Sequence, residues 1–206
     1  YNGSSWGTGT KIVASDRAGS DIFGRSVAMN SDGTKAIVGA SGGNAAYIYT
    51  YNGSSWVEQI LVASDGAAGD EFGYSVGMNS NGTKVIVGAY AEDPGGTSDA
   101  GAAYIYTYDG SNWDTGTKIV APDKEAGARF GISVSMNSDG TKVIVGAYLD
   151  HANDVDNAGA AYIFAYDGSN WDTGLKISAP DKAANDYFGY DSRGVAMSGD
   201  GARVVV

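Results

Sequence analysis

The sequence predicts an all-β protein in which a unit of four short antiparallel strands is repeated along the chain. Three observations support this: a recurring Phe-Gly pair, a recurring Val-Gly-Ala triplet that ends an apolar run, and no sustained period of 3.6 residues. The Phe-Gly pair recurs with a spacing of 49 residues once and 58 residues twice, beginning at Phe23, Phe72, Phe130 and Phe188. A fixed period of this size is typical of a repeat architecture.

The unit that begins at Phe130 shows the expected strands. The first covers Ser133–Asn137, and an Asp-Gly turn leads to the second, Lys142–Ala147, whose apolar run is typical of a strand buried on both faces. A long loop precedes the third, Ala160–Tyr166, in which aromatic residues occupy every second position. The fourth covers Lys176–Ala179. Four antiparallel strands in each period describe the blade of a β-propeller, so we expect a propeller-type repeat array.

The chain is therefore expected to hold three complete blades and parts of two others. The complete blades span residues 23–64, 72–122 and 130–180. Residues 1–15 are expected to supply only the last strand of a preceding blade, and residues 188–206 the first half of a further one. Because both ends fall inside a repeat, we expect either a longer natural protein or neighbouring copies that complete the open ends.

Composition excludes some classes of partner. The formal net charge is −11, whereas nucleic-acid binding needs a basic patch and anionic membranes attract basic segments. No apolar run is long enough to cross a bilayer. We expect neither nucleic-acid binding nor membrane insertion. The chain has no cysteine, so neither disulfides nor thiolate metal sites are available to it.

The long loops between second and third strands are the expected binding loops. In an up-and-down blade they share a face with the loops that lead to the next blade, and this face collects most of the 24 acidic residues. Long loops on a rigid scaffold tend to carry function. The candidate binding face consists of Glu92, Asp93, Asp99, Asp150, Asp154 and Asp156.

One loop also suggests a cation. Calcium prefers six to eight oxygen ligands, and the densest run of oxygen-bearing side chains includes Asp150, Asn153, Asp154 and Asp156. These four are the candidate ligands of a Ca²⁺ site, the one cofactor that the sequence suggests. The alternative is a solvated polar loop.

Catalysis is not expected. With one histidine, His151, and no cysteine, the chain lacks the parts of a nucleophile–base–orienter triad. Carboxylate pairs could serve a glycosidase. However, the recurring aspartates, such as Asp16, Asp65 and Asp123, follow the repeat and are better explained as structural loop residues.

Aromatic and asparagine residues complete the set of candidates. The alternating aromatics of the third strands are expected to pack between blades, and a lectin site would need them exposed beside polar loops. Each recurring Trp, as at Trp171, is expected to close the hydrophobic layer of a blade. N-glycosylation sequons begin at Asn2, Asn52 and Asn81.

The combination of Phe-Gly-x-Ser-Val, Val-Gly-Ala and Gly-Ala-Ala-Tyr-Ile-Tyr resembles the FG-GAP repeat family, whose best-known members form the propeller of integrin α subunits. The resemblance covers essentially the whole chain. The matching Gly-Ala pairs begin at Gly39, Gly88 and Gly146. The resemblance implies an extracellular, non-catalytic protein used for adhesion or as an accessory module. One departure is that the turns between first and second strands are too short for the calcium loop of integrin-type blades.

Three functions remain open from the sequence. The first is an adhesion or recognition module that binds a protein or glycan through the acidic loops. The second is a building block of an extracellular filament or surface appendage, in which copies of the chain assemble head to tail. The third is a carbohydrate-binding or accessory domain of a larger secreted protein.

Overall fold

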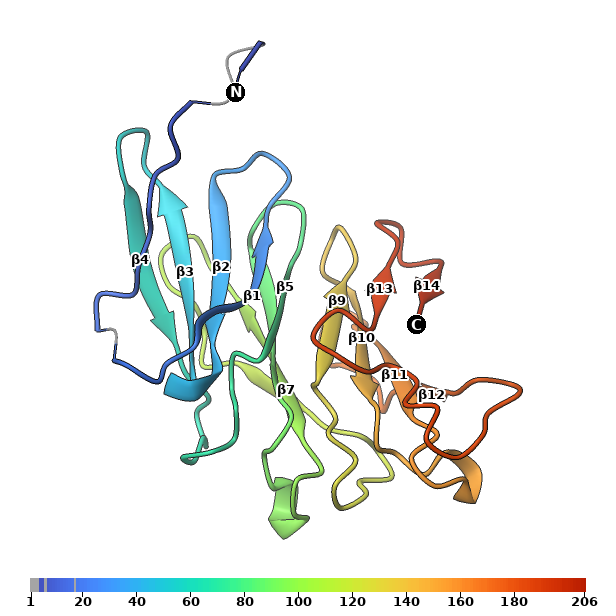
Figure 1. Cartoon of the computed structure of the whole chain (residues 1–206). Coiled ribbons are helices and arrows are strands. Elements are labelled where there is room, and N and C mark those ends of the chain that lie inside the picture. The colour runs from blue at the N-terminus through green and yellow to red at the C-terminus, as the bar shows by residue number, and fades with distance from the viewer. Residues whose placement is uncertain (1–3, 6, 17) are drawn as a thin grey trace.

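The computed structural model describes residues 4–5, 7–16 and 18–206. It contains three four-stranded antiparallel sheets and one two-stranded sheet. The sheets stand around an open arc (Figure 1), and the first strand of each contacts the first strand of the next. This arrangement confirms the predicted propeller-type array of blades. None of the helices among the described residues is long and apolar enough to span a membrane.

Each blade takes its strands in chain order from the inner to the outer edge. Blade 1 comprises β1 (Phe23–Met29), β2 (Lys35–Ala40), β3 (Ala45–Tyr51) and β4 (Trp56–Leu61). Blade 2 comprises β5 (Ser75–Met78), β6 (Lys84–Ala89), β7 (Ala102–Thr107) and β8 (Thr117–Ile119). Blade 3 comprises β9 (Ser133–Met136), β10 (Lys142–Ala147), β11 (Ala160–Ala165) and β12 (Leu175–Ile177). Partial blade 4 comprises β13 (Ala196–Met197) and β14 (Val204–Val205).

Every loop between a second and a third strand contains one short 3₁₀ turn. These turns are η1 (Ser41–Gly43), η2 (Pro94–Gly96) and η3 (Ala152–Asp154). They lie at the lower end of the molecule in Figure 1, opposite the tight turns that join first to second strands. We call the lower end the loop face and the upper end the tight-turn face.

The segment ahead of blade 1 corrects one expectation. Residues 7–16 form no strand, although a strand was expected over residues 1–15. Ile12 and Ala14 nevertheless pack on Tyr47 and Tyr49 of β3, as the last strand of a preceding blade would. Among the described residues there is no third strand of a preceding blade with which this segment could pair. It therefore keeps the packing of an outer strand without the ladder of hydrogen bonds.

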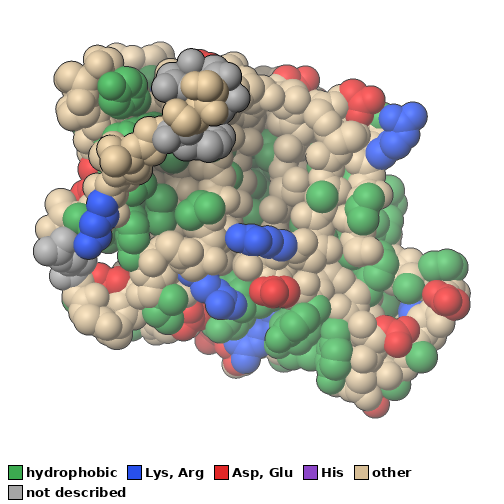
Figure 2. All heavy atoms as spheres, turned by 45° about the horizontal axis from the view of Figure 1, so that its top comes forward, with side chains coloured by type: hydrophobic (Ala, Val, Ile, Leu, Met, Phe, Trp, Pro, Cys, Tyr) green, Lys and Arg blue, Asp and Glu red, His purple; other side chains and the backbone are tan. Residues whose placement is uncertain are grey.

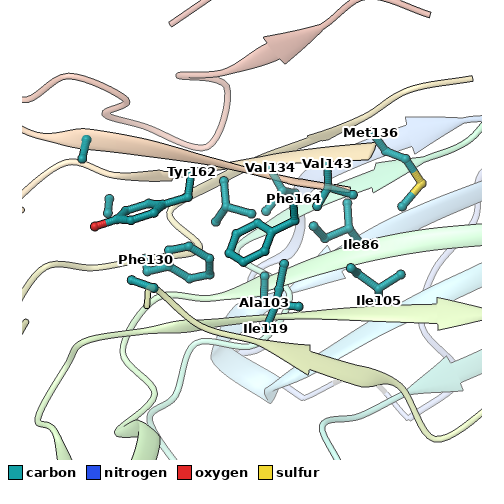
Figure 3. Close-up of a cluster of buried hydrophobic side chains, with 14 residues drawn as sticks. Ile86, Ala103, Ile105, Ile119, Phe130, Val134, Met136, Val143, Tyr162 and Phe164 are labelled. Atoms are coloured by element: carbon teal, nitrogen blue, oxygen red, sulfur yellow. The ribbon is translucent and has the colours of Figure 1, made fainter. Parts of the chain in front are cut away.

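The core lies between the blades. One face of blade 2 presents Ile86 and Ile105 to Val143, Tyr162 and Phe164 of blade 3 (Figure 3). The equivalent layer between blades 1 and 2 joins Ile37 and Ile48 to Val85, Tyr104 and Tyr106. The buried third-strand aromatics of blades 2 and 3 are therefore packed between blades, as predicted, whereas Tyr51 of blade 1 is exposed. Burying each large apolar side chain stabilises the fold by about 1.5–3 kcal/mol, so the core of each blade depends on its neighbour.

The glycines of the repeated motifs allow neighbouring backbones to approach closely. The Gly131 N–H donates to the Gly146 carbonyl within blade 3, at 3.0 Å. The carbonyl of Gly131 also lies against Gly88 of blade 2, where a Cβ would come within 2.0 Å of it. No other residue fits at Gly88 without moving the backbone. This contact explains why Phe-Gly and Val-Gly-Ala recur together.

The tight-turn face is joined by backbone hydrogen bonds from blade to blade. The Ser31 N–H donates to the Ser80 carbonyl at 2.9 Å, Ser80 to Ser138 at 3.0 Å, and Ser138 to Gly199 at 2.9 Å. Backbone atoms and uncharged polar side chains cover most of this end in Figure 2. Because these turns are bonded to one another, we look for a functional site on the loop face and along the outer strands.

Candidate functional site

The loop face is held by hydrogen bonds between successive blades. The η2 loop of blade 2 accepts at the Ser98 and Asp99 carbonyls from Gly127 and Arg129, which lie ahead of blade 3. The η3 loop of blade 3 repeats the arrangement, since Asp156 accepts from Asn185 at 2.9 Å. The two kinds of loop therefore share one face, as predicted. Their backbones are fixed, so the side chains that they carry are held in position.

Two residues of the predicted binding face are buried, which corrects their assignment. Glu92 and Asp150 point into the gaps between blades, and Asp150 is only 1% exposed. Asp150 accepts from the Tyr162 hydroxyl at 2.6 Å and lies 2.8 Å from the Lys176 ammonium. An ionised carboxylate is costly to bury unless it is paired, and here a lysine pairs it. These two side chains therefore support the fold rather than contact a partner.

Both buried carboxylates belong to a repeated cluster that we call the clasp. In blade 3 the Lys176 ammonium also binds Asp123, at 2.7 Å, and Asp123 accepts from the Tyr162 hydroxyl at 2.8 Å. Asp123 comes from the end of blade 2, so the clasp joins two blades. The second copy consists of Asp65 from blade 1 with Lys118, Glu92 and Tyr104 from blade 2.

The other predicted binding residues are more accessible. Asp93, Asp154 and Asp156 are exposed, and Asp99 is half-buried in a 2.7 Å ion pair with Arg129. Asn153 is exposed, with a φ of 53°. Three exposed carboxylates thus remain on two neighbouring loops, although Asp93 accepts from the Asp99 backbone N–H at 2.7 Å and Asp156 lies near His151. They form the acidic part of the candidate site.

The structure does not gather the predicted calcium ligands. Asp150 is buried and already neutralised by Lys176, whereas Asp154 and Asp156 face solvent. Among the described residues no group of three or more His, Cys, Asp or Glu side chains is placed to hold a metal ion. The local reason is that the loop turns Asp150 inward, away from its neighbours, to complete the clasp.

His151 joins the η3 loop to the segment ahead of blade 3. Its backbone N–H donates to Glu125 at 2.9 Å, and its Nδ1 contacts the same carboxylate. Its Nε2 lies 3.7 Å from the exposed Asp156 carboxylate. The imidazole therefore bridges two loops, which gives the single histidine a positioning role on the loop face.

A belt of aromatic and arginine side chains crosses the loop face and was not predicted. The Arg25 guanidinium lies 4.1 Å from the centre of the Tyr74 ring, and Tyr74 contacts Tyr90 edge to face. Arg129 lies over Tyr90, at 5.3 Å. The belt continues through the contact of Tyr148 with Tyr190 and Tyr187, whose exposed fractions are 59% and 39%.

The belt combines residues at three repeat positions, directly after Phe-Gly, directly after Gly-Ala and, for Arg129 and Tyr187, directly before Phe-Gly. Tyr74 and Tyr190 follow Phe-Gly, whereas Tyr90 and Tyr148 follow Gly-Ala. Tyrosine follows two of the four Phe-Gly pairs and two of the three Val-Gly-Ala triplets, which was a signal that the sequence contained. Burial raises the pKa of Tyr90 and of Tyr148, and the nearby Arg129 opposes the shift in both. Both phenols remain neutral and present a mixed apolar and hydrogen-bonding surface.

The sequons lie elsewhere. Asn52 and Asn81 are exposed in tight turns, where their side-chain carbonyls accept from the hydroxyl groups of Ser54 and Thr83, at 2.9 Å and 2.6 Å. Asn2 lies outside the described residues. Glycosylation of these positions stays a prediction.

Solved structures of similar shape include propeller-like proteins. The Kuenenia stuttgartiensis hydrazine synthase matches 95% of the chain at 11% identity, with a TM-score of 0.56. The WD40 repeats of RRP9 match 88% at 5% identity, with a TM-score of 0.54. A structure titled as a putative 6-phosphogluconolactonase from Bacteroides uniformis matches 87% at 14% identity, with a TM-score of 0.53. These likenesses support the fold alone.

The matched structures are much longer than the chain, which covers 44% of the first two and 45% of the third. No curated protein sequence matches it. The model of the FG-GAP repeat matches three consecutive segments, residues 6–55, 56–106 and 113–164. These segments include the Phe-Gly and Val-Gly-Ala contacts between blades 1, 2 and 3. The chain belongs to the FG-GAP repeat family.

Proposed function

We propose that the chain is a non-catalytic recognition module of an extracellular protein, and that it binds a basic partner protein through its loop face. The observation that carries this proposal is the exposure of Asp93, Asp154 and Asp156 on loops whose backbones are bonded from blade to blade. Because the loops are ordered before binding, a partner loses little affinity to loop ordering.

The chemistry of the loop face favours a protein as the partner. Tyrosine and arginine are enriched at protein interfaces, and the belt supplies both on the face that carries the exposed carboxylates. Charged groups at the rim of an interface mainly set the rate of encounter and the choice of partner. A net charge of −11 steers basic surfaces toward the molecule.

The recurring acids have structural uses, which also supports a non-catalytic module. Asp65 and Asp123 each accept one hydrogen bond from a tyrosine hydroxyl and one from a lysine ammonium of the next blade. Both carboxylates are thus engaged by side chains of the fold itself. We therefore assign them to blade packing.

An array of immobilised peptides of defined charge tests the proposal. We expect the full chain to bind peptides rich in lysine and arginine, with binding that weakens as salt screens the carboxylates. The variant Asp93→Asn/Asp154→Asn/Asp156→Asn is expected to lose this binding.

A matched control carries three equal changes in turns away from the loop face: Asp32→Asn and Asp139→Asn between first and second strands, and Asp109→Asn between β7 and β8. These side chains are exposed, and each accepts backbone N–H bonds through Oδ1, which asparagine retains. The control should bind as the wild type does. Equal losses in both variants would show a response to net charge alone, and no binding to any basic peptide would refute the proposal.

A further inference from the structure

A groove between the outer strands of blades 2 and 3 is separate from the loop face. It has a volume of about 710 Å³, within the range of small-molecule sites. Its lining includes Thr117 of β8 and, from blade 3, Tyr166, Trp171 and Asp172. Equivalent grooves of about 360 and 450 Å³ lie beside Trp113 and Trp56. Because similar grooves recur beside equivalent tryptophans, the groove is a feature of the repeat. The groove between blades 2 and 3 has the largest volume of the three.

The aromatic part of the groove is fixed in place. The Trp171 indole packs on the core between blades 2 and 3 and is tilted by 43° against the Tyr166 ring, with 5.4 Å between ring centres. Trp171 is only partly buried, so part of its surface faces the groove. A rigid aromatic surface beside polar groups suits a ligand with one apolar and one polar side.

Polar groups stand around this surface in set orientations. The Asp172 Oδ1 accepts from the backbone N–H groups of Ala165 and Gly174, at 3.1 Å each. On the other wall, Asp114 Oδ1 accepts from Thr107 and Gly116 in the same way. Within the described part of the chain no group donates to the second oxygen of either carboxylate, so this oxygen can accept hydrogen bonds from a ligand. Hydroxyl groups that donate to carboxylates form strong hydrogen bonds.

Charge narrows the class of ligand. Two carboxylates, Asp114 and Asp172, and two ammonium groups, Lys84 and Lys118, line the groove, so its lining is balanced in charge, and the net charge of −11 on the whole chain disfavours an anion. A cation is also disfavoured near the aromatic residues, because the Lys84 ammonium already lies 4.7 Å from the centre of the Tyr166 ring. A neutral molecule with several hydroxyl groups and an apolar ring face meets both conditions.

We propose that this groove is a binding site for a neutral sugar, whose ring lies against Trp171 and whose hydroxyl groups donate to Asp114 and Asp172. The site is independent of the loop face, so the two proposals stand or fall separately. The loop-face variant Asp93→Asn/Asp154→Asn/Asp156→Asn should bind sugar as the wild type does.

Two exposed positions give a blocking variant and a matched control. Thr117 and Leu175 are the first residues of β8 and β12, and both are exposed, but Leu175 does not line this groove. Thr117→Arg places a long side chain at the groove without disturbing the core. Leu175→Arg makes the same change of charge and places the same side chain at the equivalent position, the first residue of β12. Asp172→Asn keeps the acceptor of the turn and removes the charge.

The test measures binding of neutral monosaccharides to the full chain by ligand-observed NMR and calorimetry, with glucuronic acid as the anionic counterpart. We expect saturable binding of at least one neutral sugar, and weaker binding of glucuronic acid. Thr117→Arg and Asp172→Asn should weaken it by about tenfold, a change of about 1.4 kcal/mol, and Leu175→Arg by less than about twofold. Thermal melting checks that each variant is folded.

Three results would overturn the proposal. The first is the absence of saturable binding by any neutral sugar. The second is an equal loss in folded Thr117→Arg and Leu175→Arg, which would place binding elsewhere. The third is binding of glucuronic acid as tight as that of its neutral counterpart, which would contradict the charge argument. If Asp172→Asn does not fold, Thr117→Arg alone decides.

Discussion

The junction ahead of blade 1 and those ahead of blades 2 and 3 share one hydrogen bond but differ in charge. In all three a tyrosine of the third strand donates to an aspartate of the preceding segment, at 2.8 Å, as in Tyr47 with Asp16. The outer-strand residue paired with that tyrosine is Lys118 in blade 2 and Lys176 in blade 3, but Ile60 in blade 1.

The buried carboxylate changes together with the lysine. Blades 2 and 3 place Glu92 and Asp150 in the loop after the second strand, whereas the shorter loop of blade 1, Ser41–Asn44, carries no carboxylate. A carboxylate buried without its lysine would be strongly destabilising. The difference indicates that the lysine neutralises the buried carboxylate of the loop. A blade that lacks this carboxylate, as blade 1 does, does not need the lysine.

The largest expected effect comes from giving blade 3 the residue of blade 1. Lys176→Ile leaves Asp150, 1% exposed, without its cation, so we expect the free energy of unfolding to fall by about 3 kcal/mol. Denaturant unfolding monitored by tryptophan fluorescence measures the loss. Lys11→Ile, at the equivalent exposed position ahead of blade 1, should cost less than about 0.5 kcal/mol.

The double variant Lys176→Ile/Asp150→Ala sharpens this test. If the lysine serves mainly to neutralise the acid, removing both should recover part of the loss, as blade 1 suggests. A double variant no more stable than Lys176→Ile would show that the lysine contributes through its own packing. That result would contradict the comparison.

The repeat could be predicted from the sequence, because the backbone geometry of the blades requires particular residues at recurring positions. The β6 and β10 strands coincide with apolar runs, and Gly88 and Gly131 recur because no Cβ fits between their backbones. The outer strand β12, Leu175–Ile177, begins one residue before its predicted range, Lys176–Ala179, and ends two residues before the end of that range. Outer strands carry a weaker apolar pattern, since one face of each is solvated.

The candidate site was harder to predict, because carboxylates look alike in a sequence whether they face water or the core. Asp150 and Asp154 lie in one acidic run, yet only Asp154 is exposed. The deciding signal was distant in sequence: Lys176 and Asp150 occur together, and blade 1 lacks both. The tyrosine–arginine belt needed the structure, since Arg25 and Tyr74 come from different blades.

A pH series gives a second, smaller effect with a defined sign. Burial raises the pKa of Glu92 above its usual value near 4.5, outweighing the opposing effect of Lys118. The folded chain then binds this proton more tightly than the unfolded chain. The resulting stability is complete below pH 4.5 and is lost as pH rises through the raised pKa. Glu92→Gln has no such titrating proton. The amount by which the free energy of unfolding of the wild type exceeds that of Glu92→Gln should therefore shrink from pH 4 toward pH 7.

Asp65→Asn provides the opposite slope as a control. The hydrogen bond from Lys118 lowers the pKa of Asp65, so its contribution is present above the usual value of 3.8 and is lost as pH falls. The advantage of the wild type over Asp65→Asn should therefore shrink toward acid pH. Parallel slopes for the two variants, measured by urea unfolding at each pH, would contradict the roles assigned within the clasp.

The smallest effect compares the shared hydrogen bond with and without a lysine. Asp123→Asn keeps an acceptor for the Tyr162 hydroxyl but loses the ion pair with Lys176, and the partial exposure of both groups limits the cost to about 1 kcal/mol. Asp16→Asn keeps the acceptor for Tyr47 at a junction without the lysine, so we expect less than about 0.5 kcal/mol. Equal costs in thermal unfolding would mean that the lysine adds nothing to the blade contact through Asp123. The lysines of blades 2 and 3 would then serve the buried loop carboxylates alone.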